Sequence, residues 1–342
     1  MSEKSQWGSK LGFILASAGS VIGLGSVWKF PYMTAANGGG GFLLIFLIST
    51  ILIGFPLLLA EFALGRSAGV SAIKTFGKLG KNNKYNFIGW IGAFALFILL
   101  SFYSVIGGWI LVYLGIEFGK LFQLGGTGDY AQLFTSIISN PAIALGAQAA
   151  FILLNIFIVS RGVQKGIERA SKVMMPLLFI VLPQLFDKMP FGTIFYVLFL
   201  FATVTSSVVM LEINVGNITN QDNSKRAKWS VILGILTFVF GIPSALSYGV
   251  MADVHIFGKT FFDAMNFLVP NLLMPFGALY LSLFTGYIFK KALAMEELHL
   301  DERAWKQGLF QVWLFLLRFF VPSFQSSSWS SSPNLCNQKG LE

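Results

Sequence analysis

The sequence predicts an all-α integral membrane protein, a bundle of about nine transmembrane helices. Of its 342 residues, 55% are hydrophobic and only 11% are charged, against about 25% charged in soluble domains. The mean hydropathy is +0.71. No stretch alternates polar and apolar residues as the strands of a membrane barrel do. The single cysteine, Cys336, has no partner in the chain for a disulfide.

Nine apolar runs predict the spans, since a helix needs about 20 largely apolar residues to cross a bilayer. They lie at residues 11–35, 41–64, 87–118, 143–160, 170–186, 191–213, 229–250, 261–289 and 305–321. The first run is too long for a cleaved signal peptide and leads directly into the second. We therefore expect an N-terminal segment at 1–10, a transmembrane domain at 11–321 and a disordered, Ser-rich tail at 322–342.

Lys and Arg residues predict the orientation, because they are kept out of translocated loops. With the N-terminus in the cytoplasm, 18 of the 24 fall on the cytoplasmic side of nine alternating spans. These are Lys4, Lys10, Arg66, Lys74, Lys78, Lys81, Lys84, Arg161, Lys165, Arg169, Lys172, Lys225, Arg226, Lys228, Lys290, Lys291, Arg303 and Lys306. The net charge of +9 thus indicates a multi-pass protein of the plasma membrane rather than a nucleic-acid-binding surface.

Three glycines interrupt the first run: Gly19, Gly23 and Gly25. Each costs about 1 kcal/mol relative to alanine in a helix, so the helix is expected to unwind here. Unwound backbone is tolerated at membrane depth only against protein or a wet cavity, where free carbonyls suit a cation such as sodium. The alternative is close helix packing, because Gly19 and Gly23 form a small-xxx-small pair. Composition alone leaves both readings open.

The block around these glycines resembles the first helix of the neurotransmitter:sodium symporter family, which includes the bacterial LeuT-type amino-acid transporters. The matching residues are Trp7, Leu11-Gly12, Ala18-Gly19-Ser20, Gly23-Leu24-Gly25, Trp28-Lys29-Phe30-Pro31 and Asn37-Gly38-Gly39-Gly40. A second motif, Arg161–Arg169 followed by Pro176, is similar to the loop between the family's fourth and fifth helices. The resemblance implies the LeuT-type inverted-repeat fold, in which broken helices bind ligands near the midplane.

The resemblance also implies a sodium site, formed by the carbonyls of Gly19, Ile22 and Ala202 and the hydroxyls of Thr205 and Ser206. Five neutral oxygens suit a monovalent ion better than calcium. Val21 and Ser26 match a second sodium position, where many members carry asparagine instead of Ser26. Hydroxyls of Thr205 and Ser206 that bond only to carbonyls of their own helix are the alternative.

The substrate site that the resemblance implies lies at the same break. Its expected residues are Ser20, Val21, Gly23, Leu24 and Gly25, whose amides face a carboxylate, Tyr103, whose hydroxyl contacts that carboxylate, and Leu99, Ser206 and Met210 at the side-chain end. Alone, a membrane tyrosine is more often a packing residue. Lys29 and Asn266 match the outer gate; many members carry aspartate in place of Asn266, so this gate can hydrogen-bond but cannot form an ion pair.

The chain departs from the family near residues 182–190, where the sixth and seventh helices have no counterpart and the second repeat is incomplete. The expected function is sodium-coupled symport of an amino acid or related small amine, without an organic cofactor; a truncated, non-transporting scaffold is the alternative. The expected surroundings are the lipid bilayer, and an oligomer is compatible with them. An enzyme is not expected, because His255 and His299 lie in different loops and no metal-ligand or nucleophile–base cluster accompanies them. A channel lacks the expected charged rings or filter repeat.

Overall fold

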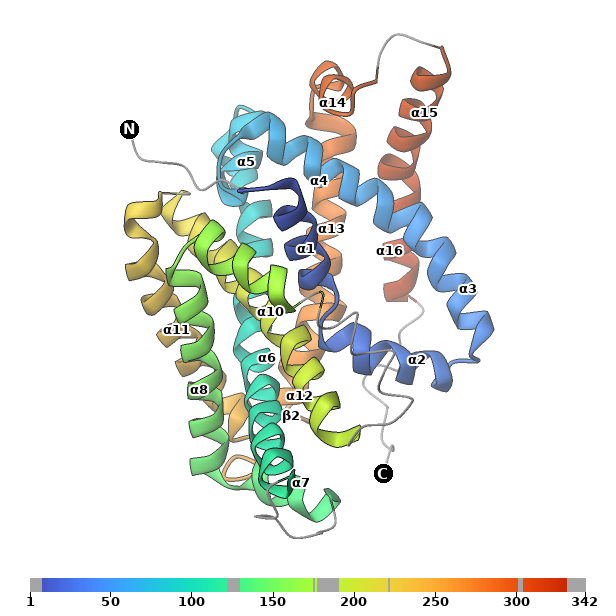
Figure 1. Cartoon of the computed structure of the whole chain (residues 1–342). Helices are drawn as coiled ribbons and strands as arrows, with labels where there is room; N and C mark the ends of the chain where they lie inside the picture. Colours follow the sequence, from blue (N-terminus) through green and yellow to red (C-terminus); the bar gives the residue numbers. More distant parts are fainter. Residues whose placement is uncertain are drawn as a thin grey trace. The chain divides into compact units, whose positions relative to one another are not determined.

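The computed structural model describes residues 8–121, 130–174, 176, 191–220, 222–300 and 304–330 (Figure 1). Its helices, with π-helical and 3-10 turns named η, and its two short strands are α1 Lys10–Val21, η1 Gly25–Lys29, α2 Phe30–Ala36, α3 Gly40–Ser49, η2 Thr50–Gly54, α4 Phe55–Ala68, α5 Ala72–Leu79, η3 Asn83–Tyr85, α6 Asn86–Leu121, α7 Tyr130–Ser139, α8 Pro141–Ser160, η4 Val163–Glu168, α10 Phe191–Thr219, α11 Asn223–Ala245, β1 His255–Ile256, β2 Lys259–Thr260, α12 Phe261–Leu268, η5 Val269–Leu273, α13 Met274–Leu283, η6 Phe284–Ile288, α14 Lys291–Glu297, α15 Ala304–Phe315, η7 Leu316–Phe320 and α16 Val321–Ser330.

Seven helical stretches in the described chain are long and apolar enough to cross a membrane. They are Gly40–Ala68, Asn83–Gly119, Pro141–Ser160, Ile194–Thr219, Asn223–Ala245, Phe261–Ile288 and Trp305–Gln325. The expected span at 11–35 is divided, and its first part, α1, has only 12 residues. Most of the expected span at 170–186 lies outside the described residues. The predominantly helical membrane architecture is confirmed, while the count of nine spans stays a prediction.

The chain divides into two compact units. Unit 1 comprises Met1–Met33 and Leu96–Asn266, and unit 2 comprises Thr34–Ala95 and Phe267–Glu342. The expected site residues all belong to unit 1. Each unit has its own buried apolar cluster, as expected when apolar side chains pack at interior density.

Unit 1 is built on α8 and α11, which lie side by side, with α10 packed against both (Figure 1). Phe151, Val159 and Val215 are fully buried between these helices. The first helix, α1, packs on α10 through Ala16, which is 2% exposed. The short helix α1 is therefore supported by α10, which is itself packed against α8 and α11.

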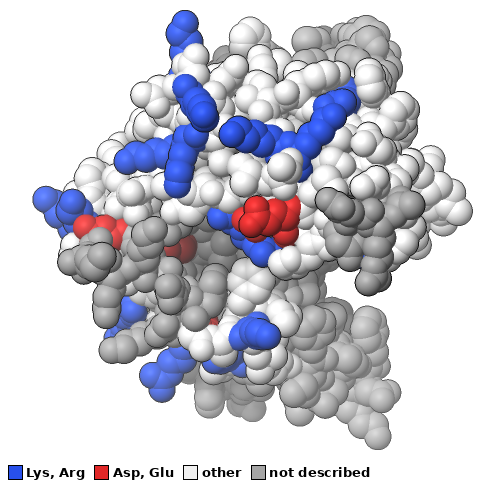
Figure 2. All heavy atoms as spheres, turned by 90° about the horizontal axis from the view of Figure 1, so that it is seen from above, with Lys and Arg blue, Asp and Glu red and all other residues white. Residues whose placement is uncertain are grey.

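Unit 2 has a core of aromatic and aliphatic side chains from α4, α5, η6, α15 and η7. Phe284 and Leu317 are fully buried there, and the indole of Trp313 donates a hydrogen bond of 3.0 Å to the carbonyl of Pro56. Figure 2 shows Lys and Arg side chains on the face at which α5 and α14 of this unit lie. This agrees with the cytoplasmic side that the sequence predicts for these two elements, while the orientation itself stays a prediction.

Four of the prolines inside the described apolar helices each follow a π-helical turn at the same spacing. They are Pro31 after η1, Pro56 after η2, Pro275 after η5 and Pro322 after η7. In each case the residue before the proline donates its N–H to the carbonyl five residues back, as Val321 does to Leu316. Proline lacks an N–H and its ring collides with the carbonyl four residues back. The wider turn places one extra residue there and relieves that collision.

The last helix corrects one expectation. Residues 322–330, assigned from sequence to a disordered tail, form most of α16, while 331–342 lie outside the described residues. Extending an existing helix costs far less than starting one, and serine costs only a few tenths of a kcal/mol there. Phe324 also stacks on Phe320 of the preceding turn, with ring centroids 6.4 Å apart. Serine-rich composition alone therefore gave the wrong boundary.

Candidate functional site

The first helix is broken where the glycines predicted it. α1 ends at Val21, and Ile22 has φ −83° and ψ 71°, which turns its carbonyl out of the helical direction. Helical structure resumes as η1 at Gly25. The Ile22 side chain packs against Leu198 and Ala202 of α10, which fixes the break against that helix.

Two hydroxyls of α10 reach across to the last turn of α1. Thr205 Oγ1 lies 3.0 Å from the Gly19 carbonyl oxygen, and Ser206 Oγ lies 3.3 Å from the Gly19 oxygen and 3.1 Å from the Ser20 oxygen. Both side chains are buried. Thr205 also lies 2.9 Å and 3.1 Å from the carbonyls of Phe201 and Ala202 in its own helix. Back-bonding therefore occurs, but it accounts for only part of the contacts.

Two carbonyl oxygens of this cluster, those of Gly19 and Ser20, belong to the last turn of α1, where the helix supplies no N–H partners. The Thr205 and Ser206 hydroxyls face them, whereas the Phe201 and Ala202 carbonyls also accept N–H groups of their own helix. Crowded carbonyl dipoles make a region of negative potential, and burial strengthens it because the local dielectric constant is low. Such a region attracts a cation.

The spacing of these oxygens is that of hydrogen-bonded pairs, slightly shorter than the spacing of oxygens around an ion of sodium's size. Ca²⁺, which is similar in size, holds oxygens at about 2.3–2.6 Å, so that ligands at right angles are about 3.3–3.7 Å apart. The Gly19, Ala202, Thr205 and Ser206 oxygens lie 3.0–3.3 Å from their neighbours. With its hydrogen turned to the Phe201 carbonyl, the Thr205 hydroxyl keeps a lone pair that it can offer to a cation.

The hydroxyl of Tyr103 lies on the opposite side of the break. It accepts a hydrogen bond of 3.1 Å from the amide of Leu24, and its contacts include the side chains of Ser206 and Thr203. Gly23 is enclosed between these groups: a Cβ there would lie 2.4 Å from Ser206 Oγ and 3.1 Å from Tyr103 Oη. The structure thus combines the two readings of the glycines, an unwound segment and a close helix approach.

The other expected substrate residues differ in burial and in whether they pack near Leu24 and Tyr103. Met210 packs in the same cluster as Leu24 and Tyr103, whereas Leu99 is partly buried one turn before Tyr103 on α6. Val21 is 71% exposed and Gly25 faces open space. Their participation in a pocket stays a prediction.

The two residues expected at the second sodium position contact each other in the structure, whereas the two expected at the gate do not. Ser26 Oγ donates a hydrogen bond of 2.8 Å to the Val21 carbonyl, so these two oxygens are adjacent. Lys29 and Asn266 are both exposed, and neither makes a hydrogen bond or ion pair with any residue that the structure describes. The gate therefore rests on the resemblance alone.

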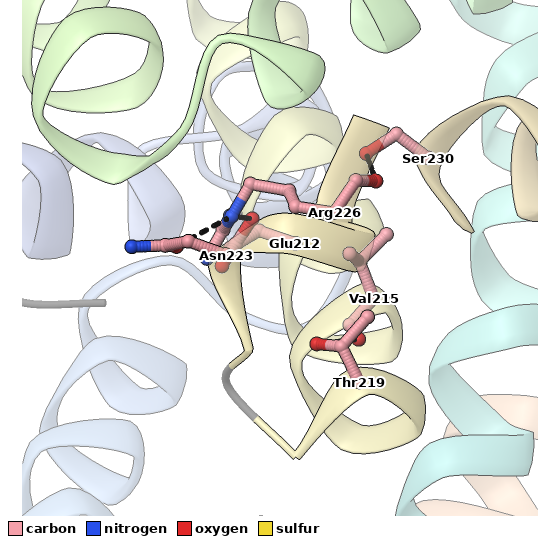
Figure 3. Close-up of polar contacts among 6 residues, drawn as sticks. All are labelled: Glu212, Val215, Thr219, Asn223, Arg226 and Ser230. Atoms are coloured by element: carbon pink, nitrogen blue, oxygen red, sulfur yellow. Dashed lines mark hydrogen bonds and ion pairs between the residues drawn. The ribbon is translucent and has the colours of Figure 1, made fainter. Parts of the chain in front are cut away.

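An ion pair that the sequence analysis missed joins α10 to α11 (Figure 3). Arg226, whose side chain is 3% exposed, donates Nη1 to Glu212 Oε2 and Nε to Asn223 Oδ1 at 3.2 Å. Figure 3 shows Glu212 and Arg226 pointing toward each other from the two helices. A carboxylate within an apolar run was the available signal, since intramembrane charges are rare and paired.

Comparisons with known proteins agree with this geometry. The model of the sodium:neurotransmitter symporter family matches residues 4–123. The uncharacterized sodium-dependent transporter YhdH of Bacillus subtilis (strain 168) is 38% identical, covering 94% of this chain and 96% of the relative. The rat sodium-dependent neutral amino acid transporter B(0)AT2 is 37% identical over 116 residues, covering 34% of this chain and 16% of the relative.

The solved structures give the fold. The crystal structure of MhsT in complex with L-phenylalanine matches with a TM-score of 0.86 and 28% identity, covering 96% of this chain and 100% of that chain. This match confirms the predicted LeuT-type fold. The alignment with YhdH spans 437 positions whereas this chain has 342 residues, so stretches of the relative have no counterpart here, as the resemblance implied. The chain belongs to the sodium:neurotransmitter symporter family and is a sodium-dependent, multi-pass membrane transporter.

Proposed function

We propose that this chain couples the movement of sodium to the transport of an amino acid or related small amine. Gly19, Ile22, Ala202, Thr205 and Ser206 hold the sodium ion, and the Leu24 amide and Tyr103 hydroxyl receive the substrate carboxylate. The substrate class is supported by two similar proteins, MhsT in complex with L-phenylalanine and a neutral amino acid transporter. The observation that carries the proposal is the meeting of the buried Thr205 and Ser206 hydroxyls with the Gly19 and Ser20 carbonyls, which have no helical partners at the end of α1.

Coupling follows from the shared position of the two ligands. Sodium bound between Gly19 and Thr205 holds the last turn of α1 beside α10 and fixes the break that follows it. Leu24 follows Ile22 by two residues, and the Tyr103 hydroxyl contacts Ser206, so both groups are then held in place for the substrate. Because each ligand binds a break already ordered by the other, each raises the affinity for the other by the same factor.

The test is substrate binding to the purified protein in sodium and in potassium. We expect binding in sodium only, and its loss in the double variant Thr205→Ala with Ser206→Ala. The matched control is Thr219→Ala with Ser230→Ala, which removes two buried hydroxyls that bond only within their own helices, to Val215 and Arg226 (Figure 3). Binding that is equal in the two salts, or equal loss in both double variants, contradicts the sodium site.

Uptake into proteoliposomes distinguishes transport from binding. We expect substrate to accumulate when a sodium gradient is imposed and not when potassium replaces sodium. Sodium-dependent binding without accumulation would favour the alternative, a family member that keeps the scaffold and the ion site but does not transport. The stretches of YhdH without counterpart here are the observation that keeps this alternative in view.

A further inference from the structure

The second motif, Arg161–Arg169, has no part in the proposed ligand sites, yet it ends in a buried carboxylate that contacts the beginning of α1. Glu168, the last residue of η4, is 3% exposed. It accepts a hydrogen bond of 2.6 Å from the Ser9 hydroxyl and one of 2.8 Å from the Gly8 amide, and Lys172 Nζ lies 2.7 Å away. Three donors from two segments therefore converge on one side chain.

The sequence of α1 is fitted to this carboxylate. Ser9 is the N-cap of the helix and accepts a hydrogen bond of 3.0 Å from the Gly12 amide while donating to Glu168. A Cβ at Gly12 would lie 2.1 Å from Glu168 Oε1, so only glycine leaves room for the carboxylate at this position. A negative charge at the N-terminus of a helix is also stabilised by the helix dipole.

The element that carries Glu168 is fixed to the rest of unit 1. Ile167, next to it, is 1% exposed and packs in the same buried cluster as Leu211 and Val215 of α10. Gly166 lies against the Ile158 carbonyl of α8, where a Cβ would be 2.0 Å from that oxygen. Glu168 is thus held in a fixed position by its neighbours, and the start of α1 is hydrogen-bonded to it.

α1 is therefore held at both ends. It has 12 residues and is about 18 Å long at 1.5 Å per residue. Glu168 holds its first turn, the hydroxyls of Thr205 and Ser206 hold its last turn, and the unwound residues Ile22 and Gly23 follow as a hinge. Releasing the first turn allows the helix to pivot and carry the Gly19 carbonyl away from α10.

We propose that Glu168 is a positioning residue that latches the first turn of α1 to η4 and so determines how readily the helix leaves the sodium site. The latch consists of Gly8, Ser9, Glu168 and Lys172. This inference rests on the proposed function for its sodium readout, but the latch itself can be measured without sodium.

The experiment measures the exposure of α1 directly. A cysteine replaces the buried Ala16 in a Cys336→Ser background, and its reaction rate with a water-soluble thiosulfonate is followed in detergent. Glu168→Gln removes the negative charge and replaces one carboxylate oxygen by an NH2 group. This group cannot accept the hydrogen bond that the Gly8 N–H donates to Glu168. Because a hydrogen bond to a charged group is worth about tenfold or more in an equilibrium constant, we expect the rate to rise about tenfold without sodium.

Controls separate a local release from general loosening. Glu296→Gln makes the same chemical change at an exposed carboxylate on α14 and leaves the rate unchanged. A second reporter, Ala245→Cys, lies on α11, where Ala245 is 1% exposed, and its rate does not change in Glu168→Gln. Ser9→Thr, which keeps the hydroxyl, behaves as wild type, whereas Ser9→Ala behaves as Glu168→Gln.

Sodium supplies the second readout. We expect sodium to slow labelling at Ala16→Cys, with the half-saturating concentration about tenfold higher in Glu168→Gln, because sodium must then draw the helix back. An unchanged rate in Glu168→Gln, or an equal rise at both reporters, overturns the latch. If sodium has no effect but Glu168→Gln still speeds labelling, the latch is supported and the proposed sodium site is wrong.

Discussion

Tyr103 accepts the amide hydrogen of Leu24 across 3.1 Å, and this bond joins the long helix α6 to the broken first helix. Both residues are buried, with 7% and 5% of their surface exposed. The amide of Leu24 lacks a helical partner because the chain has just left α1, so the tyrosine hydroxyl satisfies a donor that unwinding sets free. The bond therefore couples the conformation of the break to the position of α6.

Tyr103→Phe removes that acceptor while keeping the ring. We expect the free energy of unfolding to fall by about 1–3 kcal/mol, the cost of a buried donor left without a partner. Substrate affinity should fall at least tenfold, because the same hydroxyl is proposed to contact the carboxylate. Calorimetry of substrate binding in sodium checks this, with Tyr32→Phe, at a tyrosine that is 58% exposed, as the control. Equal substrate affinity in Tyr103→Phe and Tyr32→Phe contradicts the assignment.

Gly23→Ala tests the close approach at the break. The added Cβ would lie 2.4 Å from Ser206 Oγ, so we expect a loss of about 1–3 kcal/mol from overpacking and a marked drop in sodium affinity. Gly146→Ala, on α8 with no atom within 4 Å of the new Cβ, should be neutral or stabilising. Adding Ser206→Ala to Gly23→Ala removes the collision and should recover stability but not sodium binding. Thermal unfolding with and without sodium separates the two effects.

Much of the fold could be predicted from sequence because the bilayer imposes simple requirements. Apolar runs predicted the seven spans seen among the described residues, and the spacing of Gly19, Gly23 and Gly25 predicted the break. Helix boundaries were less accurate. The sequence predicts the end of the last span at residue 321, whereas the π-helical turn before Pro322 lets the helix continue. That accommodation depends on backbone geometry, which hydropathy does not record.

The candidate site divides in the same way. The family resemblance implied Thr205 and Ser206 as partners of Gly19, and the structure places both hydroxyls on the Gly19 carbonyl. Contacts that no resemblance implied, such as Glu168 with Ser9, could not be predicted. They depend on which helix faces pack together, and a single sequence carries no record of that pairing.

The latch should respond to pH only in strongly acidic solution. Hydrogen bonds from Lys172 and Ser9 to the charged carboxylate lower the pKa of Glu168 from 4.5 to about 2. Since the folded state has the lower pKa, the stabilisation is complete above about pH 4.5 and is lost as the pH falls toward 2. The difference in melting temperature between wild type and Glu168→Gln should be constant from pH 7 to 5 and shrink below that. With Glu296→Gln as the reference variant, a difference that shrinks already between pH 7 and 5 contradicts this assignment.

The Glu212–Arg226 pair should behave as a single buried unit. Replacing either partner, by Glu212→Gln or Arg226→Gln, leaves the other charge buried between α10 and α11, which costs about 3 kcal/mol or more. The double variant leaves no buried charge, so its loss of stability should be smaller than the sum by about 1–3 kcal/mol. Nearby Lys225 lies 3.8 Å from Asp222 and is 65% exposed, so Lys225→Gln should cost less than about 1 kcal/mol. The free energy of unfolding is measured for wild type, the two single variants and the double variant. Strictly additive losses would mean that the two charges act independently and would contradict the prediction.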